Sequence, residues 1–556
     1  ESFLPARCGR PTAAVSAEYG GARQGKGMAR PRGFHRSALL LLCTAVPTGA
    51  LLLPTPPDGR RLPRLSRGRR RQVASASVRA CEAAAKANAT RAAILREMVG
   101  VGAPALVGLA IEPVASLVDT AFMGRCCSAV QLAGVGVGIS IFNVVAKAFN
   151  FLSPATTSLV AAASSSGDEA GAFSDSMVRV TSASLAVAAG LGLTVTAALT
   201  FSIGSILDVI VRVPPSDPLR ASARGYLIFR ALAAPGVLGM LCMQGAFRGA
   251  RDTKTPLTAL GLITLSNVLL DALFIPQKFL GWGAAGAAAA TTIAQYAGFG
   301  LLFSSFRRRC SSTGVVKPPS SPSFRIFGLP APRRSDCKRL LSAGSVLTLR
   351  TLAVVSSFSY SSLAASTLGA AEGAAHQICL QIWLASSLLA DAVAIAAQAL
   401  LASYSAIGEI KMAKMVVGLT VSGGAAMGTI TAALLHLHGQ AVLSLFTSDP
   451  AVLGLALSAW PVVALSQPLT TLAFSYDGLL FGANDFRFCA LLMVMSSAPA
   501  AFIIWALTPR MGLRGIWAGL ACLMTLRALL AAIRISSRSG PWSIYKDPSK
   551  GLSERS

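Results

Sequence analysis

The sequence predicts an all-α polytopic membrane protein with twelve transmembrane helices in two parallel six-helix repeats. Of its 556 residues, 53% are hydrophobic and only 13% are charged, whereas soluble proteins carry about 25% charged residues. Apolar runs recur from about residue 93 to about residue 536, and each is long enough to cross roughly 30 Å of hydrocarbon. Alternating segments of about ten residues, the pattern of a membrane β-barrel, are absent, which favours helices.

The chain before the first span reads as a targeting arm, residues 1–90. Within it, residues 28–53 have a basic start and then an apolar stretch, as in a secretory signal. Residues 54–90 contain the acid-free segment GRRLPRLSRGRRRQVASASVRA, which resembles an organelle transit peptide. The two in tandem resemble the bipartite leader of proteins sent to plastids bounded by extra membranes. The alternative is a disordered basic tail.

The net charge of +27 is concentrated in this arm and in loops. Residues 1–80 hold fifteen Lys and Arg against three acids, but no aromatic residues alternate with them, so we expect no nucleic-acid partner. A Pro/Ser-rich basic linker spans residues 307–337, and loops on its side of the membrane carry more Lys and Arg than the opposite loops. This bias places both termini and the linker on one positive side, which in a plastid is the stroma.

The twelve spans follow in order, separated by breaks rich in Gly, Pro and Ser. We expect an N-lobe of six helices at 91–306, a C-lobe of six helices at 338–536 and a tail at 537–556. The spans centre near residues 107, 145, 192, 235, 266, 293, 353, 388, 424, 462, 497 and 524.

Two constant offsets connect the halves. At +233, QGAFRGARD lies over DGLLFGAND, so the turns after the fourth and tenth helices are predicted to be equivalent. At +241, the second helix lies over the eighth, and Asn150 falls on Asp391. Because corresponding loops keep their sides, the repeats are parallel, which predicts a cavity at their interface.

Polar side chains in the first half form three stripes, each on one helix face because of its spacing. A charge at the bilayer centre costs roughly 2.5–3.5 kcal/mol, so such groups face partners or water, and together they predict a buried hydrated pocket. The stripes are Glu112 and Asp119 on the first helix, Asn143, Lys147 and Asn150 on the second, and Asn267 and Asp271 on the fifth.

Clustered carboxylates raise one another's pKa, which suits a proton-binding site near neutral pH. The same oxygen atoms, with an Asn amide, also suit sodium, so both coupling ions stay open. The alternative is a structural salt bridge, for example between Lys147 and Glu112.

The second half carries a comparable face on the eighth helix. Arg350, on the seventh helix, is either the counter-ion of Asp391 or an anion-binding group, because guanidinium matches a carboxylate in a two-pronged fork. His376 precedes the core of the eighth helix and is expected to cap or pack. The face consists of Gln377, Gln381, Asp391 and Gln398.

Several long segments in order and spacing make the chain resemble the multidrug and toxic compound extrusion (MATE) transporters over residues 93–536. They include EPVASLVDTAFMGR, FRGARDTKTPL, SNVLLDALFI and AAHQICLQIWLASSLLADAVAIAAQALLAS, which look most like the plant and algal branch of the DinF-type subgroup. The resemblance implies a two-lobed fold of twelve helices, alternating access, and efflux driven by inward flow of protons or sodium. Organic-anion exporters belong to this branch.

The resemblance also assigns roles residue by residue. Asp119 matches the helix-one aspartate used for cation coupling, and Asn267 and Asp271 match the helix-five pair of the same site. Pro104 matches the proline at which the first helix bends. Several family members have an acid in helix seven, whereas this helix has none and carries Arg350. Glu112 and Lys147 lie outside the minimal site.

Other function classes have little support in the sequence. No G-x-S-x-G and no G-x-x-x-x-G-K-[ST] motif is present, and the histidines do not have metal-site spacing, so we expect no enzyme, no metal and no cofactor beyond the coupling ion. The competing transport hypotheses are a flippase for lipid-linked precursors and a multidrug exporter of organic cations. The expected partners are membrane lipid and a small organic solute, for which a carboxylate is the first expectation. We expect a monomer in the plastid envelope, and the alternative location is the plasma membrane or another endomembrane.

Overall fold

A computed structural model describes the transporter-like part of the chain. It covers residues 88–164 (apart from 112, 114, 116–121 and 124–125), 173–210, 217–312, 329–537 and 539–545. The predicted targeting arm before residue 88 therefore lies outside the described residues, as do most of the basic linker and the end of the tail. Glu112 and Asp119 also lie outside them.

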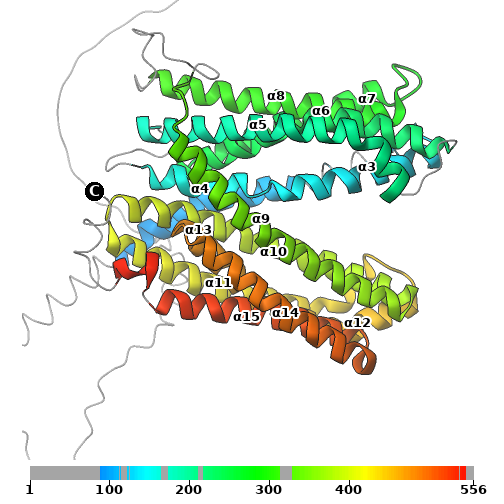
Figure 1. The fold of residues 1–556 in the computed structure, drawn as a ribbon. Helices are drawn as coiled ribbons and strands as arrows, with labels where there is room; N and C mark the ends of the chain where they lie inside the picture. The colour runs from blue at the N-terminus through cyan, green and yellow to red at the C-terminus, as the bar shows by residue number, and fades with distance from the viewer. Residues whose placement is uncertain are drawn as a thin grey trace, which may run out of the picture. The chain divides into compact units, whose positions relative to one another are not determined.

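The described chain is built from helices, and Figure 1 shows two groups of them. The first group begins with a helical segment at Asn88–Ile111. It continues with α3 (Ala129–Ala148), α4 (Leu152–Ala162), α5 (Asp175–Ser205), the short π-helix η1 (Ile206–Ile210), α6 (Pro218–Gly249), α7 (Lys254–Phe274) and α8 (Gly283–Ser312).

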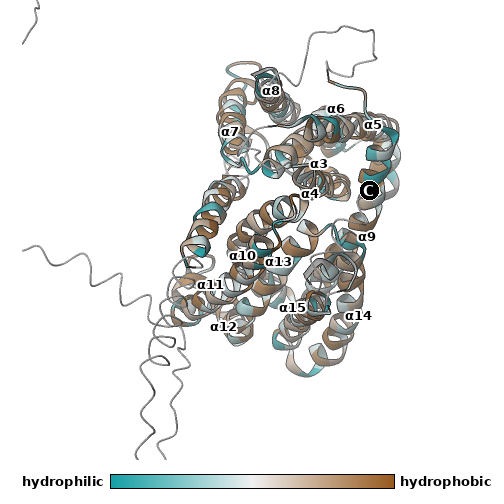
Figure 2. Ribbon diagram, turned by 90° about the vertical axis from the view of Figure 1, so that its left-hand side faces the viewer, coloured by the Kyte–Doolittle hydropathy of each residue, from teal (hydrophilic) through white to brown (hydrophobic). Residues whose placement is uncertain are grey.

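The second group follows the linker. Figure 2 shows hydrophobic residues along the sides of helices in both groups. The second group consists of α9 (Arg334–Leu368), α10 (Ala370–Ala406), α11 (Ile410–Ser444), α12 (Pro450–Leu465), α13 (Gln467–Gly482), α14 (Phe486–Met511), α15 (Leu513–Ser536) and the 3-10 helix η2 (Gly540–Tyr545).

Length and hydropathy bear out the predicted spans. Ten helices are long and apolar enough to cross a membrane, and α12 with α13 forms an eleventh, bent by 50°. The helix α8, rich in Ala and Gly, lies at the sixth predicted span, near residue 293, and is not among these eleven. The bend has a local cause, because Pro468 at the start of α13 lacks an N–H and cannot continue the ladder of α12. Its counterpart Pro235 lies inside the unbroken α6.

The internal repeat predicted from the sequence recurs in helix packing. A Cβ on Gly249 would lie 2.7 Å from the Thr157 carbonyl oxygen, and a Cβ on Gly482 would lie 2.9 Å from the Gln398 carbonyl oxygen. These glycines let α6 approach α4 in the first half and α13 approach α10 in the second half. The two contacts are related by the +233 and +241 offsets.

The turns after these helices are equivalent as well. Arg251 and Asn484 both have a left-handed backbone, with φ of 61° and 57°. In each turn the next residue is an aspartate whose backbone amide ends the helix. The amide of Asp252 donates to the Phe247 carbonyl oxygen and that of Asp485 to the Leu480 carbonyl oxygen, each at a distance of 2.9 Å. Each aspartate then pairs with an arginine at 2.8 Å, Arg309 in the first half and Arg534 in the second.

The helix groups meet near the ends at which the chain leaves α4, α6, α8, α10 and α13, which we call the positive end. Gln398 on α10 donates to Ser158 at 2.8 Å and to the Pro154 carbonyl oxygen at 2.7 Å on α4. Ser158 in turn donates to the Phe481 carbonyl oxygen on α13 at 2.7 Å. In Figure 1 the groups are close where α4 meets α13 and diverge toward the labelled ends of α3 and α12.

The first helical segment also contacts both groups. Its residues Ile94, Met98 and Val101 are buried in a core otherwise made by α10, α11, α13, α14, α15 and η2. Glu97 accepts from Arg251 at 2.9 Å and from the Tyr404 hydroxyl at 2.5 Å, so it links the turn after α6 to the end of α10. The positive end is therefore closed in this structure.

Candidate functional site

The polar pair on α7 faces the protein interior. The Asn267 amide nitrogen donates to the Asp271 carboxylate at 2.9 Å, and the two residues are 5% and 0% exposed. On the opposite face, Leu265 and Leu269 are 58% and 62% exposed. An apolar outer face with a buried carboxylate is the arrangement expected where a membrane helix holds a functional acid toward its own bundle.

The first helical segment lies between this helix and α10. Gly108 approaches Leu260 on α7, where an added Cβ would be 3.3 Å from its side chain, and Gly102 approaches the Ala392 carbonyl oxygen at 3.3 Å. The segment stays helical through Pro104. Because proline has no backbone N–H, one hydrogen bond of the helix is missing there and the helix is weakened. The continuation that carries Glu112 and Asp119 lies outside the described residues.

The stripe on the second span is exposed rather than buried. Asn143 and Lys147 lie on α3, and Asn150 lies in the break between α3 and α4. Among the described residues, Lys147 has no ion-pair partner. Its hypothetical partner Glu112 is not described, so the salt-bridge alternative stays a prediction.

The second half contains a buried charge cluster that differs from the predicted one. Arg350 was predicted either to be the counter-ion of Asp391 or to bind an anion, and in the structure its guanidinium donates to Asp477 on α13 rather than to Asp391. Asp477 also accepts from Arg527 on α15 at 2.6 Å. The physical reason is proximity, because Asp477 lies within reach of Arg350, whereas Asp391 is half-buried on α10 and forms no ion pair with a described residue.

Asp477 and Arg527 were missed by the sequence interpretation. Their side chains are only 7% and 3% exposed. Each stands alone in an apolar run, TLAFSYDGLLFG and CLMTLRALLAAI respectively. An isolated charged residue in a membrane span indicates a functional or structural charge site, and the sequence shows such a residue in both runs.

The remaining predicted residues of α10 have separate environments. Gln377 and Gln381 are exposed, and Gln377 donates to Ser362 at 3.1 Å. Gln398 is buried in the contact between helix groups described above. His376 is fully buried, lies 3.4 Å from the Ser361 hydroxyl and packs on Trp517, which confirms the packing role.

Comparisons with known proteins agree with this fold and cover both halves. A family model described as MatE matches residues 104–273 and 347–507. Protein DETOXIFICATION 44, chloroplastic, of Arabidopsis thaliana is 39% identical over 461 residues, which cover 82% of this chain and 85% of that protein. Protein DETOXIFICATION 45, chloroplastic, of the same plant is 35% identical over 475 residues, covering 83% and 81%. A crystal structure of MATE in the bent conformation has a TM-score of 0.71 at 18% identity, covering 83% of this chain and 98% of that one.

Proposed function

The chain belongs to the MatE family of transporters, and from that premise we propose that it exports an organic anion in exchange for H⁺ or Na⁺ by alternating access. The observation that carries the coupling half of this proposal is the buried pair of Asn267 and Asp271 on α7. A carboxylate in hydrocarbon is costly when charged, so binding a proton or sodium there changes the stability of the surrounding helices.

Alternating access needs a second state in which the positive end opens. The closing contacts include polar ones, namely the Gln398 bonds to α4 and the Glu97 bonds to Arg251 and Tyr404, beside the apolar packing of the first helical segment on the second group. The polar contacts can exchange protein partners for water at small net cost, because one hydrogen bond contributes about 0.5–1.5 kcal/mol. This supports a transporter that rocks about the site between its halves.

We base the solute class on Lys147, which is exposed on α3 and forms no ion pair with a described residue. Arg350 on α9 is already paired with Asp477, so it would have to exchange that partner to bind a carboxylate. A cation without an acidic partner suits a carboxylate more than an organic cation. A multidrug exporter of organic cations and a flippase for lipid-linked precursors are the alternatives.

Uptake into proteoliposomes tests the proposal and these alternatives together. We expect labelled organic acids to accumulate under an imposed pH or sodium gradient, and the responding gradient identifies the coupling ion. Arg350→Lys keeps the charge but loses the fork, so it should weaken transport of the acid while the coupling ion still moves. Transport of organic cations alone would contradict the organic-anion proposal. Normal transport by both Arg350→Lys and Arg350→Gln would show that Arg350 does not recognise the solute.

We place the protein, as a monomer in lipid, in the plastid envelope. Its many apolar helices make it an integral membrane protein, and its relatives include chloroplastic proteins. The tandem of residues 28–53 and 54–90 supports delivery there. Fusing residues 28–90 to a fluorescent protein should give plastid fluorescence, and a purely cytosolic signal would contradict the location.

A further inference from the structure

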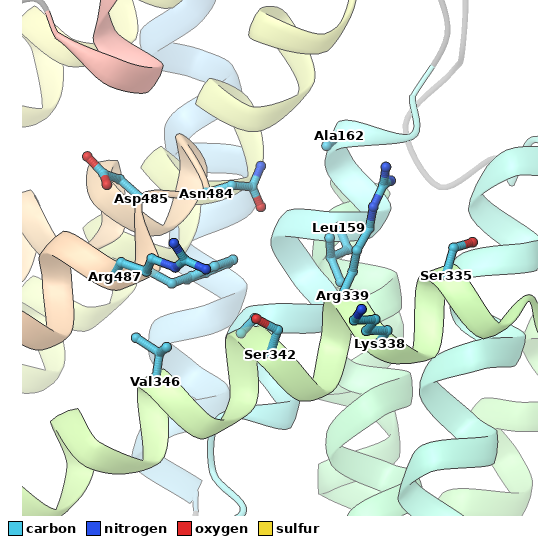
Figure 3. A pocket seen from close by; sticks show the side chains of 12 residues that line it. Leu159, Ala162, Ser335, Lys338, Arg339, Ser342, Val346, Asn484, Asp485 and Arg487 are labelled. Atoms are coloured by element: carbon cyan, nitrogen blue, oxygen red, sulfur yellow. The ribbon is translucent and has the colours of Figure 1, made fainter.

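A pocket of about 700 Å³ lies at the positive end, between the two helix groups. Its apolar floor comes from α4, α9 and α14, and its rim is polar. The floor consists of Leu159, Ala162, Ala343, Val346 and Phe486, and the rim of Ser335, Lys338, Arg339, Ser342, Asn484, Asp485 and Arg487. In Figure 3, Arg487 comes from one side of the pocket, and Lys338 and Arg339 come from α9 on the other.

The positive charge in this pocket has no acidic partner in the described part of the chain. Lys338, Arg339 and Arg487 form no ion pair with any described residue. The acid in the described lining, Asp485, is already bonded to Arg534 at 2.8 Å and to the Trp542 indole at 3.3 Å. Three positive charges therefore share one volume, and none of them is paired with an acid of the described residues.

The equivalent turn in the first half has its own ion pairs. There Arg251 pairs with Glu97, and Arg309 pairs with Asp252. Burial raises the pKa of Asp252, but bonds from Thr255 and the charge of Arg309 outweigh it, so the net pKa is lowered and the acid stays ionised. Lys254, the first-half counterpart of Arg487, forms no ion pair with a described residue, and beside the second turn Lys338 and Arg339 add two further charges.

The donors around the pocket are held by regular structure. Ser335, Lys338 and Ser342 are spaced by three and four residues, so they share one face of α9. The left-handed backbone of Asn484, with φ of 57°, is fixed by the amide of Asp485 bonding to Leu480. The backbone that carries the recognising groups is thus held in place, which reduces the entropy lost on binding.

We propose that this pocket binds an anion that carries a phosphate group, and that its occupancy favours the state closed at the positive end. Phosphate offers several acceptor oxygens, with one charge in a diester and up to two in a monoester, to three cations and nearby hydroxyl and amide donors. The volume far exceeds that of a bare ion, so the rest of the molecule rests on Leu159, Val346 and Phe486. The pocket joins α4 of one group to α9 and α14 of the other, so a bound anion ties them together.

Two sources offer this chemistry, a soluble phosphate ester and the head group of an anionic lipid. The full chain would be purified and studied in nanodiscs of neutral phosphatidylcholine. One arm adds glycerol 3-phosphate from solution, and the other replaces part of the lipid with phosphatidylglycerol. Binding is read by titration calorimetry for the ester and by the midpoint of thermal unfolding for both.

We expect one arm to give a salt-sensitive response. Lys338→Gln/Arg339→Gln/Arg487→Gln should weaken it about tenfold or more, since charged hydrogen bonds are lost. Lys338→Arg/Arg487→Lys, which keeps the charges, should retain most of it, and Lys254→Gln on the equivalent turn should not change it. A response in only the ester arm or only the lipid arm identifies the source.

Hydrogen exchange tests the effect on conformation. Amides of residues 152–162 on α4 should exchange more slowly when the effective probe is present, and the triple Gln variant should lose this protection. Absence of a response in both arms, or an undiminished response in the triple variant, would overturn the site. An equal response to a dicarboxylate would overturn its phosphate preference, and unchanged exchange on α4 would overturn its effect on closure. None of these readouts depends on transport, so they stand apart from the proposed function.

Discussion

Asp271→Asn is expected to abolish gradient-driven transport while leaving the protein folded. The substituted amide retains an oxygen that can accept the 2.9 Å bond from Asn267, so the local shape of α7 is kept. The charge that binds a proton or sodium is lost, and removing a charge from a fully buried position relieves a cost of roughly 2.5–3.5 kcal/mol. The variant should therefore express and unfold like the parent, or be more stable.

The measurement is uptake or efflux by proteoliposomes under imposed pH and sodium gradients. Asp208→Asn is the matched control, because Asp208 is an acid of the same helix group that is half-exposed and paired with Arg220. Asp119→Asn should behave like Asp271→Asn if the resemblance places it in the same site, and Glu112→Gln should have a smaller effect. Full gradient-driven transport by Asp271→Asn would move the coupling site to the second half, around Asp391 and Asp477.

The second large effect concerns stability. Asp477→Asn should strongly destabilise the protein, because it leaves Arg350 and Arg527 buried without their common partner. Breaking a buried ion pair in this way costs about 3–5 kcal/mol. We expect a lower midpoint of thermal unfolding in detergent and a lower yield of folded protein.

Arg527→Met is the informative comparison for this cluster. It removes one of two positive charges but leaves the pair of Arg350 and Asp477, so it should cost less than Asp477→Asn. The side chains are similar in length, which limits the loss of packing against Phe474, over whose ring Arg527 lies at 5.2 Å. The reverse order of stabilities would show that Asp477 is not the group that neutralises the cluster.

Much of the architecture was predictable because it depends on local patterns. The lengths of the apolar runs determine the spans, and the offsets of +233 and +241 anticipated equivalent turns at Arg251 and Asn484 with the same left-handed backbone. The pair of Asn267 and Asp271 was also anticipated, since residues four apart on a helix face the same side.

The partners of charged groups were less predictable. Arg350 was predicted either to be the counter-ion of Asp391 or to bind an anion, whereas the structure pairs it with Asp477. A single sequence gives the face of each helix but not the rotation and depth of one helix against another. Likewise, Gln398 belongs to a predicted polar face but is bonded to Pro154 and Ser158, residues more than two hundred positions away.

The sequence by itself determined that this chain crosses a membrane many times, repeats its fold and holds acids inside it, because hydrophobic run length and periodicity are properties of neighbouring residues. Only the tertiary structure decided which charges meet. The placement of α13 relative to α9 and α15 puts Asp477 in contact with both Arg350 and Arg527. Close packing of α4 against α10 and α13 seals the positive end, and the placement of α9 against α14 leaves three cations around one pocket. Such contacts depend on how separate helices dock, and long-range docking is encoded by the shapes of both surfaces rather than by either sequence segment.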